Sequence, residues 1–322
     1  MTAPTVTPLP GPPLPGPSLS PSRAADFKTC PLLFRFRTVD RLPEQPSADQ
    51  ARGTLVHAVL ERLFDLPAAE RTPEAAAALV APSWAALLAD EPSLADIFAV
   101  TARLSADPAV AAAEADATGQ AVLLDAPPAD DAARLAAFLG SARTLLDGYF
   151  AVEDPRRLEP AEREALISAT VDEELLIRGY IDRLDVSPAG DLRVVDYKTG
   201  GAPREAFEGR ALFQLKFYAL VLWRTRGVVP RVLRLVYLKD AEVCDYSPDA
   251  DELERFERTL VALSQAIEKA KRDQDFRPKP SRLCGWCNHQ ALCPEFGGTP
   301  PPYPTVDTTP LEATAADDDR LG

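Results

Sequence analysis

The sequence lacks the features of a membrane or exported protein. It has no run of about eighteen or more uncharged apolar residues, which a transmembrane helix requires. The opening segment, MTAPTVTPLPGPPLPG, lacks the basic and then apolar order of a secretory signal. We therefore expect a cytoplasmic protein with no membrane partner. Hydrophobic residues make up 46% and charged residues 26% of the 322, which excludes a collagen-like or fully disordered chain.

Positive charge is also scarce, since 35 Lys and Arg stand against 49 Asp and Glu, for a formal net charge of −14. Alone, this value argues against a nucleic-acid partner. The charge is unevenly spread, however, because residues 40–175 carry 10 basic and 25 acidic side chains, whereas residues 176–295 carry 20 and 18. The acidity lies mainly in one central block, and the rest of the chain does not exclude a polyanionic ligand.

The two ends of the chain differ in composition from its middle. Eight of the first 22 residues are proline, which predicts a disordered, extended leader over residues 1–18. The segment 297–322 is Pro-rich and then acidic, which predicts a disordered tail. Between them we distinguish four segments: an N-terminal helical part at 19–71, an acidic helical insertion at 72–155, a core at 156–280 and a Cys-rich segment at 281–296.

The hydrophobic pattern changes at Glu162, where strand-like alternation begins. EREALISATV, ELLIRGYIDRLDVS and DLRVVDY predict three successive strands, and a helix is expected over 204–226. A strand VLRLVYL, a short strand around Val243 and a long helix over 249–272 follow. This order predicts an α/β fold with a central mixed β-sheet flanked by helices.

Two aspartates stand in the second and third predicted strands. Pairing across the turn SPAGD would bring Asp182 and Asp196 to one end of the sheet. Converging carboxylates repel one another, and a hard cation such as Mg²⁺ or Mn²⁺ neutralises them. Lys198 lies two residues beyond Asp196 and points to the same face. A metal-bound water beside an ammonium group is suited to attack on a phosphodiester, although Asp-x-Lys alone is more often a surface ion pair.

Three further polar residues gain meaning only from their context. His57 is one of two histidines and lies in the middle of an amphipathic helix expected over 50–66, where a histidine is more often packed than metal-bound. Gln214 and Tyr218 are spaced one helical turn apart and share a helix face.

Taken in order, these motifs resemble the RecB-type exonucleases of the PD-(D/E)XK nuclease superfamily, including the CRISPR-associated adaptation exonucleases and the AddB nuclease domain. The matching motifs are LSPSRAADFKTCP, RGTLVH, G-x-x-D-R, D-Y-K-T-G and Q-x-x-x-Y. They span residues 19–294 except for the acidic insertion. The resemblance implies a restriction-endonuclease-like nuclease core at 156–280, with residues 19–71 as the N-terminal part of the same domain.

The resemblance also implies a role for each matching residue. The implied metal ligands are His57, Asp182, Asp196 and the backbone carbonyl of Tyr197. The implied catalytic residues are Asp182, Asp196, Lys198, Gln214 and Tyr218. Among these, Lys198 serves the attacking water, while Gln214 and Tyr218 position the strand being cut. Glu164 is similar to a further acidic position of the family.

Cysteine is rare, but four of the five cysteines form a pattern. Cys284, Cys287 and Cys293 give C-x2-C-x5-C, and Cys30 stands alone near the start of the N-terminal part. In a cytoplasmic protein this spacing indicates a metal site, and by itself it does not choose between zinc and an iron-sulfur cluster. One cysteine before the nuclease core and three after it resembles the iron-sulfur branch of these nucleases. The resemblance therefore implies a [4Fe-4S] cluster, with Zn²⁺ as the alternative.

Together these inferences predict a metal-dependent deoxyribonuclease, a DNA exonuclease acting on single-stranded DNA or duplex ends in DNA repair, recombination or CRISPR adaptation. The alternative is a catalytically inactive nuclease fold that binds DNA or assembles partners. The chain has no G-x-x-x-x-G-K-[ST] motif, so unwinding would need a separate helicase, and CRISPR adaptation proteins are the other expected partners. The basic run at 34–37 and the helix carrying Lys269, Lys271 and Arg272 are candidate phosphate contacts.

Overall fold

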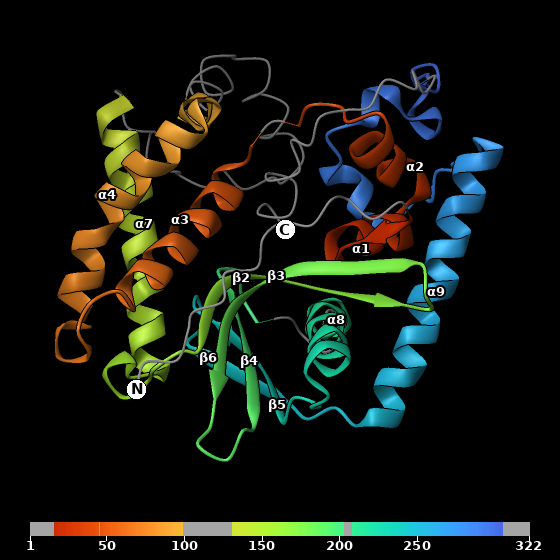
Figure 1. Ribbon diagram of the computed structural model, residues 1–322. Coiled ribbons are helices and arrows are strands. Elements are labelled where there is room, and N and C mark those ends of the chain that lie inside the picture. The colour runs from red at the N-terminus through yellow and green to blue at the C-terminus, as the bar shows by residue number, and fades with distance from the viewer. Residues whose placement is uncertain (1–15, 45, 99–130, 203–207, 305–322) are drawn as a thin grey trace.

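The computed structural model describes residues 16–44, 46–98, 131–202 and 208–304 (Figure 1). Most of the predicted leader and tail therefore lies outside the described residues. Of the tail, residues 297–304 are described, and the ring of Tyr303 stacks on Phe276 with the ring centroids 6.1 Å apart. None of the described helices is long and apolar enough to cross a membrane.

A mixed six-stranded sheet lies at the centre of the molecule, which confirms the predicted fold class. Its strands are β1 (Ser18–Leu19), β2 (Glu162–Val171), β3 (Leu175–Val186), β4 (Leu192–Lys198), β5 (Val232–Tyr237) and β6 (Glu242–Tyr246). The order is β1-β3-β4-β5-β6, and β2 pairs with β3. β3 is antiparallel to β2 and β4, β4 is parallel to β5, and β5 is antiparallel to β6.

Helices cover both sides of this sheet (Figure 1). One group comprises α1 (Pro21–Thr29), α2 (Pro31–Phe34), α8 (Glu208–Arg226) and α9 (Ala250–Asp273). The other group comprises α3 (Ala48–Leu63), α4 (Pro73–Asp90) and α7 (Asp131–Val152). Because successive strand residues point to opposite faces, β4 contributes to both cores: Val194 packs with the first group, and Val195 and Tyr197 pack with the second.

α3 carries the predicted histidine and has a well-defined start. Ser47 accepts a hydrogen bond from the backbone N–H of Gln50, whose side chain accepts one from the backbone N–H of Ser47. This capping box fixes the beginning of the helix. The buried residues Leu55, Val56 and Val59 then hold the middle of α3 in the core.

Gly148 allows α7 to lie close to the sheet. A Cβ at this position would lie 1.8 Å from the backbone oxygen of Leu238, just beyond β5. No side chain fits into this space, so the close approach of α7 depends on the glycine. Gly140, in the same helix, would have no atom within 4 Å of an added Cβ.

Candidate active site

The candidate site lies at a fork where β3 and β4 separate. Backbone pairing between the two strands ends at Arg183 and Val195, whereas β4 stays paired with β5 to its last residue. Beyond the fork, the backbone N–H of Tyr197 donates to Asp182 Oδ2 over 2.7 Å, and its carbonyl oxygen lies 3.0 Å from His57 Nε2. The separation of the strands therefore frees the Tyr197 backbone to contact two of the predicted metal ligands.

β2 brings a third ligand candidate to the same place. The flanking pairs of the β2–β3 ladder place Glu164 opposite Asp182. His57 Nδ1 lies 3.6 Å from both Glu164 Oε1 and Asp182 Oδ2. Within the described parts of the chain, these three residues form the only group of three or more His, Cys, Asp or Glu whose ligand atoms all lie within 4.8 Å of one another. The structure thus brings Glu164 together with two predicted metal ligands.

The backbone is irregular at this point of the sheet. Glu164 has φ = 41°, in the left-handed region that non-glycine residues rarely adopt. The alternation of side chains along β3 is also interrupted here, because Ile181 and Leu184 both pack in the core that contains α8. Backbone strain of this kind persists only where the surroundings impose it, and it is frequent at functional sites.

The His57 ring is surrounded by hydrogen-bond acceptors. A neutral ring that donates its Nε2–H to the Tyr197 carbonyl turns the lone pair of Nδ1 toward two carboxylates. Burial disfavours the charged ring, but Asp182, Glu164 and Asp196 together raise the pKa of His57 to about 9. A proton, or a metal ion in its place, is therefore favoured between the ring and the carboxylates.

The remaining predicted side chains form a connected chain from β4 to α8. Asp196 is 1% exposed, and its Oδ2 lies 2.8 Å from Lys198 Nζ. The Lys198 ammonium donates to Gln214 Oε1 over 2.8 Å, and Gln214 Nε2 donates to the Tyr218 hydroxyl over 2.8 Å. Burial raises the pKa of Asp196 to about 6, with Lys198 opposing this change and Asp182 adding to it. Burial also raises the pKa of the Asp182 carboxyl.

The structure explains why the first residue of the G-x-x-D-R motif, Gly179, is a glycine. A Cβ on this residue would lie 2.8 Å from Cε1 of Tyr218. The aromatic ring therefore lies directly against the backbone of β3. A larger residue at position 179 would displace this ring and disturb the hydrogen bond between Tyr218 and Gln214.

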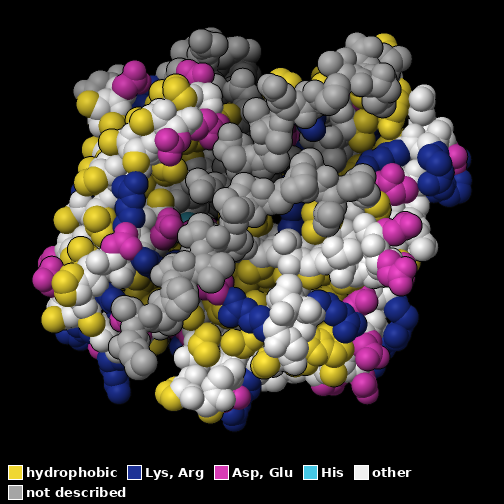
Figure 2. Space-filling model, viewed as in Figure 1, with side chains coloured by type: hydrophobic (Ala, Val, Ile, Leu, Met, Phe, Trp, Pro, Cys, Tyr) yellow, Lys and Arg dark blue, Asp and Glu magenta, His cyan; other side chains and the backbone are white. Residues whose placement is uncertain are grey.

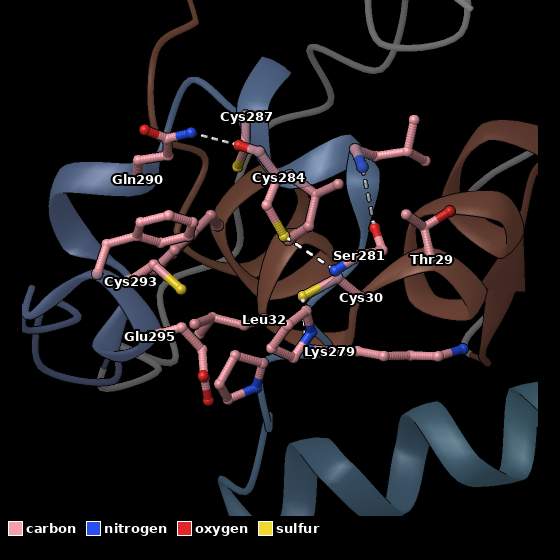
Figure 3. Close-up of a pocket in the computed structure, with 16 residues that line it drawn as sticks. Thr29, Cys30, Leu32, Lys279, Ser281, Cys284, Cys287, Gln290, Cys293 and Glu295 are labelled. Atoms are coloured by element: carbon pink, nitrogen blue, oxygen red, sulfur yellow. Dashed lines mark hydrogen bonds between the residues drawn. The ribbon is translucent and has the colours of Figure 1, made fainter.

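The four predicted cysteine ligands line one pocket (Figure 3). Cys30 joins α1 to α2, and the other three lie in or beside the short 3₁₀ helices η5 (Arg282–Trp286) and η6 (Gln290–Leu292). The backbone N–H groups of Lys279 and Ser281 donate to the sulfurs of Cys30 and Cys284 over 3.4 and 3.2 Å. All four thiols are free. Burial raises the pKa of the Cys287 thiol, and the neighbouring thiols add to this effect.

The candidate phosphate contacts already have acidic partners. Arg37 pairs with Asp26 and Glu44, and Lys271 pairs with Glu268. These ion pairs give the basic residues local structural roles. On the face seen in Figure 2, acidic and basic side chains are interspersed.

Sequence reasoning missed Glu153, which directly follows α7. Its carboxylate accepts two hydrogen bonds from the guanidinium of Arg183, the last residue of the G-x-x-D-R motif. Glu153 lies in the acidic insertion and belongs to none of the motifs. The only signal in the sequence was Arg183 itself, because a buried arginine needs an acidic partner and no motif supplies one.

The buried carboxylates, the histidine and the lysine at the strand fork are the side-chain types that hold a divalent metal ion and support hydrolysis by a metal-bound water. A sequence model of the PD-(D/E)XK nuclease superfamily matches residues 18–294, and the chain belongs to this superfamily. Nucleases of this superfamily use divalent metal ions.

The chain is also similar to individual proteins. The Gene 69 protein of Mycobacterium phage L5 is 30% identical over 123 residues, which are 37% of this chain and 40% of that protein. The chain therefore matches less than half the length of this relative. The crystal structure of a candidate exonuclease from Eubacterium rectale is similar with a TM-score of 0.43 and 11% identity, over 84% of this chain and 87% of the other. At this TM-score the similarity carries no argument about activity.

Proposed function

We propose that the chain is a Mg²⁺- or Mn²⁺-dependent exonuclease that hydrolyses phosphodiester bonds of single-stranded DNA or of duplex ends. The observation that carries the proposal is the gathering of His57, Glu164 and Asp182 beside the buried Asp196–Lys198 pair at the fork of β3 and β4. Three carboxylates converge there with one lysine and one histidine, so a divalent cation would balance their charge.

The residues present fit such a cation. Carboxylates, a backbone carbonyl and an imidazole are suitable donors for Mg²⁺ or Mn²⁺. In an octahedral site with bonds of about 2.1 Å, adjacent donors lie about 3 Å apart. His57 Nδ1 lies 3.6 Å from both Asp182 Oδ2 and Glu164 Oε1, which is close to this spacing. We assign His57, Asp182, Asp196 and the Tyr197 carbonyl as ligands, with Glu164 as a further one.

Lys198 is the residue best placed to act on the reacting groups. When bound, the cation would lower the pKa of a coordinated water. The Lys198 ammonium is fixed between Asp196 and Gln214, where it can orient the attacking water or stabilise charge that develops on the phosphate. Tyr218 holds Gln214 from the other side. We therefore assign Gln214 and Tyr218 to positioning the strand being cut.

The RecB-type class and the DNA substrate rest on the order of the motifs. RGTLVH lies on α3, G-x-x-D-R on β3, D-Y-K-T-G at the end of β4 and Q-x-x-x-Y on α8. Side chains from all four elements meet at one site, which supports the resemblance to RecB-type exonucleases. The proposed setting is DNA repair and recombination or CRISPR adaptation, with a separate helicase or CRISPR adaptation proteins as partners.

We further propose that Cys30, Cys284, Cys287 and Cys293 hold a [4Fe-4S] cluster. Around a single zinc ion with Zn–S bonds of about 2.3 Å, the sulfurs would lie about 3.8 Å apart. In the part of the chain that the structure describes, no three of these sulfurs lie within 4.8 Å of one another. The order of the cysteines, one before the nuclease core and three after it, is what favours a cluster over one zinc ion. A cluster here would tie the N-terminal helices to the end of the chain.

The activity is tested by digestion of end-labelled single-stranded and duplex DNA with anaerobically purified protein, in Mn²⁺, Mg²⁺ or EDTA. We expect progressive shortening that needs metal and that Asp196→Asn lacks while still binding DNA. A wild-type protein that binds DNA and Mn²⁺ but never shortens DNA would support the catalytically inactive fold. Cleavage of circular DNA would contradict an exonuclease.

The cluster is tested by measuring iron, sulfide and zinc in the same preparation. We expect iron and sulfide in equal amounts, and their loss in Cys287→Ser. Cys244→Ser is the matched control, because Cys244 lies in β6 outside the pocket. Zinc in place of iron would overturn the cluster in favour of the alternative.

A further inference from the structure

We propose that Glu153 and Arg183 are positioning residues, which hold Tyr197 so that its backbone presents the metal site. The proposal rests on the proposed function, because the role it assigns is toward the divalent cation. It also gives the helical insertion a direct connection to the chemistry, since Glu153 directly follows α7.

The first observation is the geometry of a buried ion pair. Arg183 Nη1 donates to Glu153 Oε2 over 2.7 Å, and Arg183 Nη2 donates to Glu153 Oε1 over 3.0 Å. The two side chains are 1% and 5% exposed. This two-pronged arrangement fixes both the position and the plane of the guanidinium.

The second observation is what the fixed guanidinium holds. Arg183 Nη1 also donates to the Tyr197 hydroxyl over 2.6 Å. The Tyr197 ring packs edge-on against Tyr149 and His57, with ring centroids 5.8 and 6.0 Å apart. The ring is therefore held at its tip by a hydrogen bond and along its sides by packing.

Fixing the ring also fixes the backbone to which it is attached. Tyr197 lies beyond the point where β3 stops pairing with β4, so β3 gives its N–H and carbonyl no backbone partner. The same N–H and carbonyl face Asp182 and His57. We call the Glu153–Arg183 pair and its hydrogen bond to the Tyr197 hydroxyl the clamp. The clamp holds Tyr197 on the side where pairing with β3 is missing.

Arg183 has a second acidic neighbour, which shows what the loss of Glu153 would do. Arg183 Nε lies 3.1 Å from Asp185 Oδ1, and Asp185 also pairs with Arg193 over 2.8 Å. Without Glu153, Asp185 becomes the only carboxylate in contact with Arg183 among the described residues. Asp185 already accepts from Arg183 Nη2 over 3.2 Å, so it would keep its hold on Nε and Nη2. Nη1, which donates to the Tyr197 hydroxyl, would lose its carboxylate partner and its fixed position.

A buried ion pair is weak evidence for stability, because apolar residues of similar shape often stabilise a fold at least as well. Positional control of the site is the better explanation for keeping the pair buried. Partners of metal ligands in other proteins typically change metal affinity tenfold to about a hundredfold when they are removed. We expect effects in this range from changes in the clamp.

The test measures Mn²⁺ binding directly by isothermal titration calorimetry on the full chain, alongside DNA digestion at increasing Mn²⁺. Tyr197→Phe removes only the hydroxyl and keeps the ion pair, so the variant is expected to fold. We expect its Mn²⁺ dissociation constant to rise about tenfold, with activity recovering at high Mn²⁺ and the KM for DNA unchanged. Glu153→Gln should show a larger rise in the same direction.

Glu257→Gln is the matched control. It removes a carboxylate that accepts a hydrogen bond from Arg224 Nε over 2.6 Å between α8 and α9, and neither residue is part of the Glu153–Arg183–Tyr197 set. Mn²⁺ affinity should be unchanged in this variant. The proposal that the clamp positions Tyr197 is wrong if Tyr197→Phe folds and binds Mn²⁺ like the wild type. This holds even if Glu153→Gln fails to fold. If the wild type itself cuts DNA and binds Mn²⁺, such a result leaves the proposed function intact. A wild type without Mn²⁺ binding would overturn both.

Discussion

The strand fork and the cysteine pocket differ in what holds their side chains in place. At the fork, Asp182, Asp196 and Lys198 extend from a hydrogen-bonded sheet, and each contacts another polar group of the site. In the pocket, the cysteines lie on a helix junction and on short 3₁₀ turns, and all are partly exposed. The fork is therefore organised by the fold, whereas the proposed cluster would be the main constraint on the pocket.

This difference separates two kinds of sensitivity to mutation. A residue of the fork can be changed at the cost of activity while the sheet around it stays folded. A cysteine of the pocket lies on short 3₁₀ turns with little regular structure around it. Its substitution should therefore lower the stability of the folded protein. The following predictions test this contrast, from the largest expected effect to the smallest.

Asp196→Ala and Lys198→Ala should each lower the rate of DNA cleavage by at least about a thousandfold, because Asp196 is proposed to hold the metal ion and Lys198 to stabilise charge that develops in the transition state. Thermal unfolding should show little loss of stability in either variant. Steady-state cleavage and differential scanning calorimetry measure the two effects. Retained turnover in both variants would remove the assignment of the active site.

Cys287→Ala should lack the iron expected in the wild type and lower the unfolding temperature by many degrees, because the proposed cluster would contribute to the free energy of folding. Cys244→Ala, outside the pocket, should change either quantity only slightly. Metal analysis and thermal unfolding in parallel measure this contrast. A stable, fully active Cys287→Ala protein would show that the pocket, like the fork, stays folded without a bound group.

Gly148→Ala should lower the free energy of unfolding by about 2–3 kcal/mol, because the methyl group would push α7 away from Leu238. Gly140→Ala in the same helix has room for its methyl group and should raise stability by about 0.5–1 kcal/mol. Chemical unfolding of both variants measures the difference. Equal effects at the two positions would argue against the close approach of α7 to the sheet.

Asp196→Asn should stabilise the metal-free protein more at pH 8 than at pH 4. The folded pKa of Asp196, about 6, lies above its ordinary value of 3.8. The stability that protonated Asp196 contributes is therefore fully present below pH 4 and is lost as the pH rises through 6. The advantage of the Asn variant should grow by roughly 2–3 kcal/mol between these limits. Unfolding in the presence of EDTA at both pH values measures it, and an advantage that shrinks with pH would contradict the burial argument.

Much of the fold was predictable because the sheet and helices have clear periods. The alternation in EREALISATV gives the observed bounds of β2, and the order of strands and helices gives the mixed sheet. The placement of Asp182 beside the end of β4 and the contact of Gln214 with Tyr218 follow from motif spacing on these elements. Local pattern and tertiary structure agree at these positions.

Other features depend on contacts that no local pattern encodes. The pair between Glu153 and Arg183 joins residues on separate elements, and the acidic composition around Glu153 hides it. The left-handed backbone of Glu164 arises from tertiary constraints in a strand whose sequence looks regular. Gly148 and Gly179 matter because of the atoms that approach them, which only the folded chain shows.

The central claim is that the fork of β3 and β4 holds a catalytic divalent cation. The most direct measurement is the anomalous X-ray signal of Mn²⁺ in crystals of the anaerobically purified protein. We predict a Mn²⁺ peak in contact with His57, Asp182 and Asp196, and its absence in crystals of Asp196→Ala. A fully loaded crystal with no Mn²⁺ at the fork, or with Mn²⁺ bound equally well in Asp196→Ala, would contradict the claim.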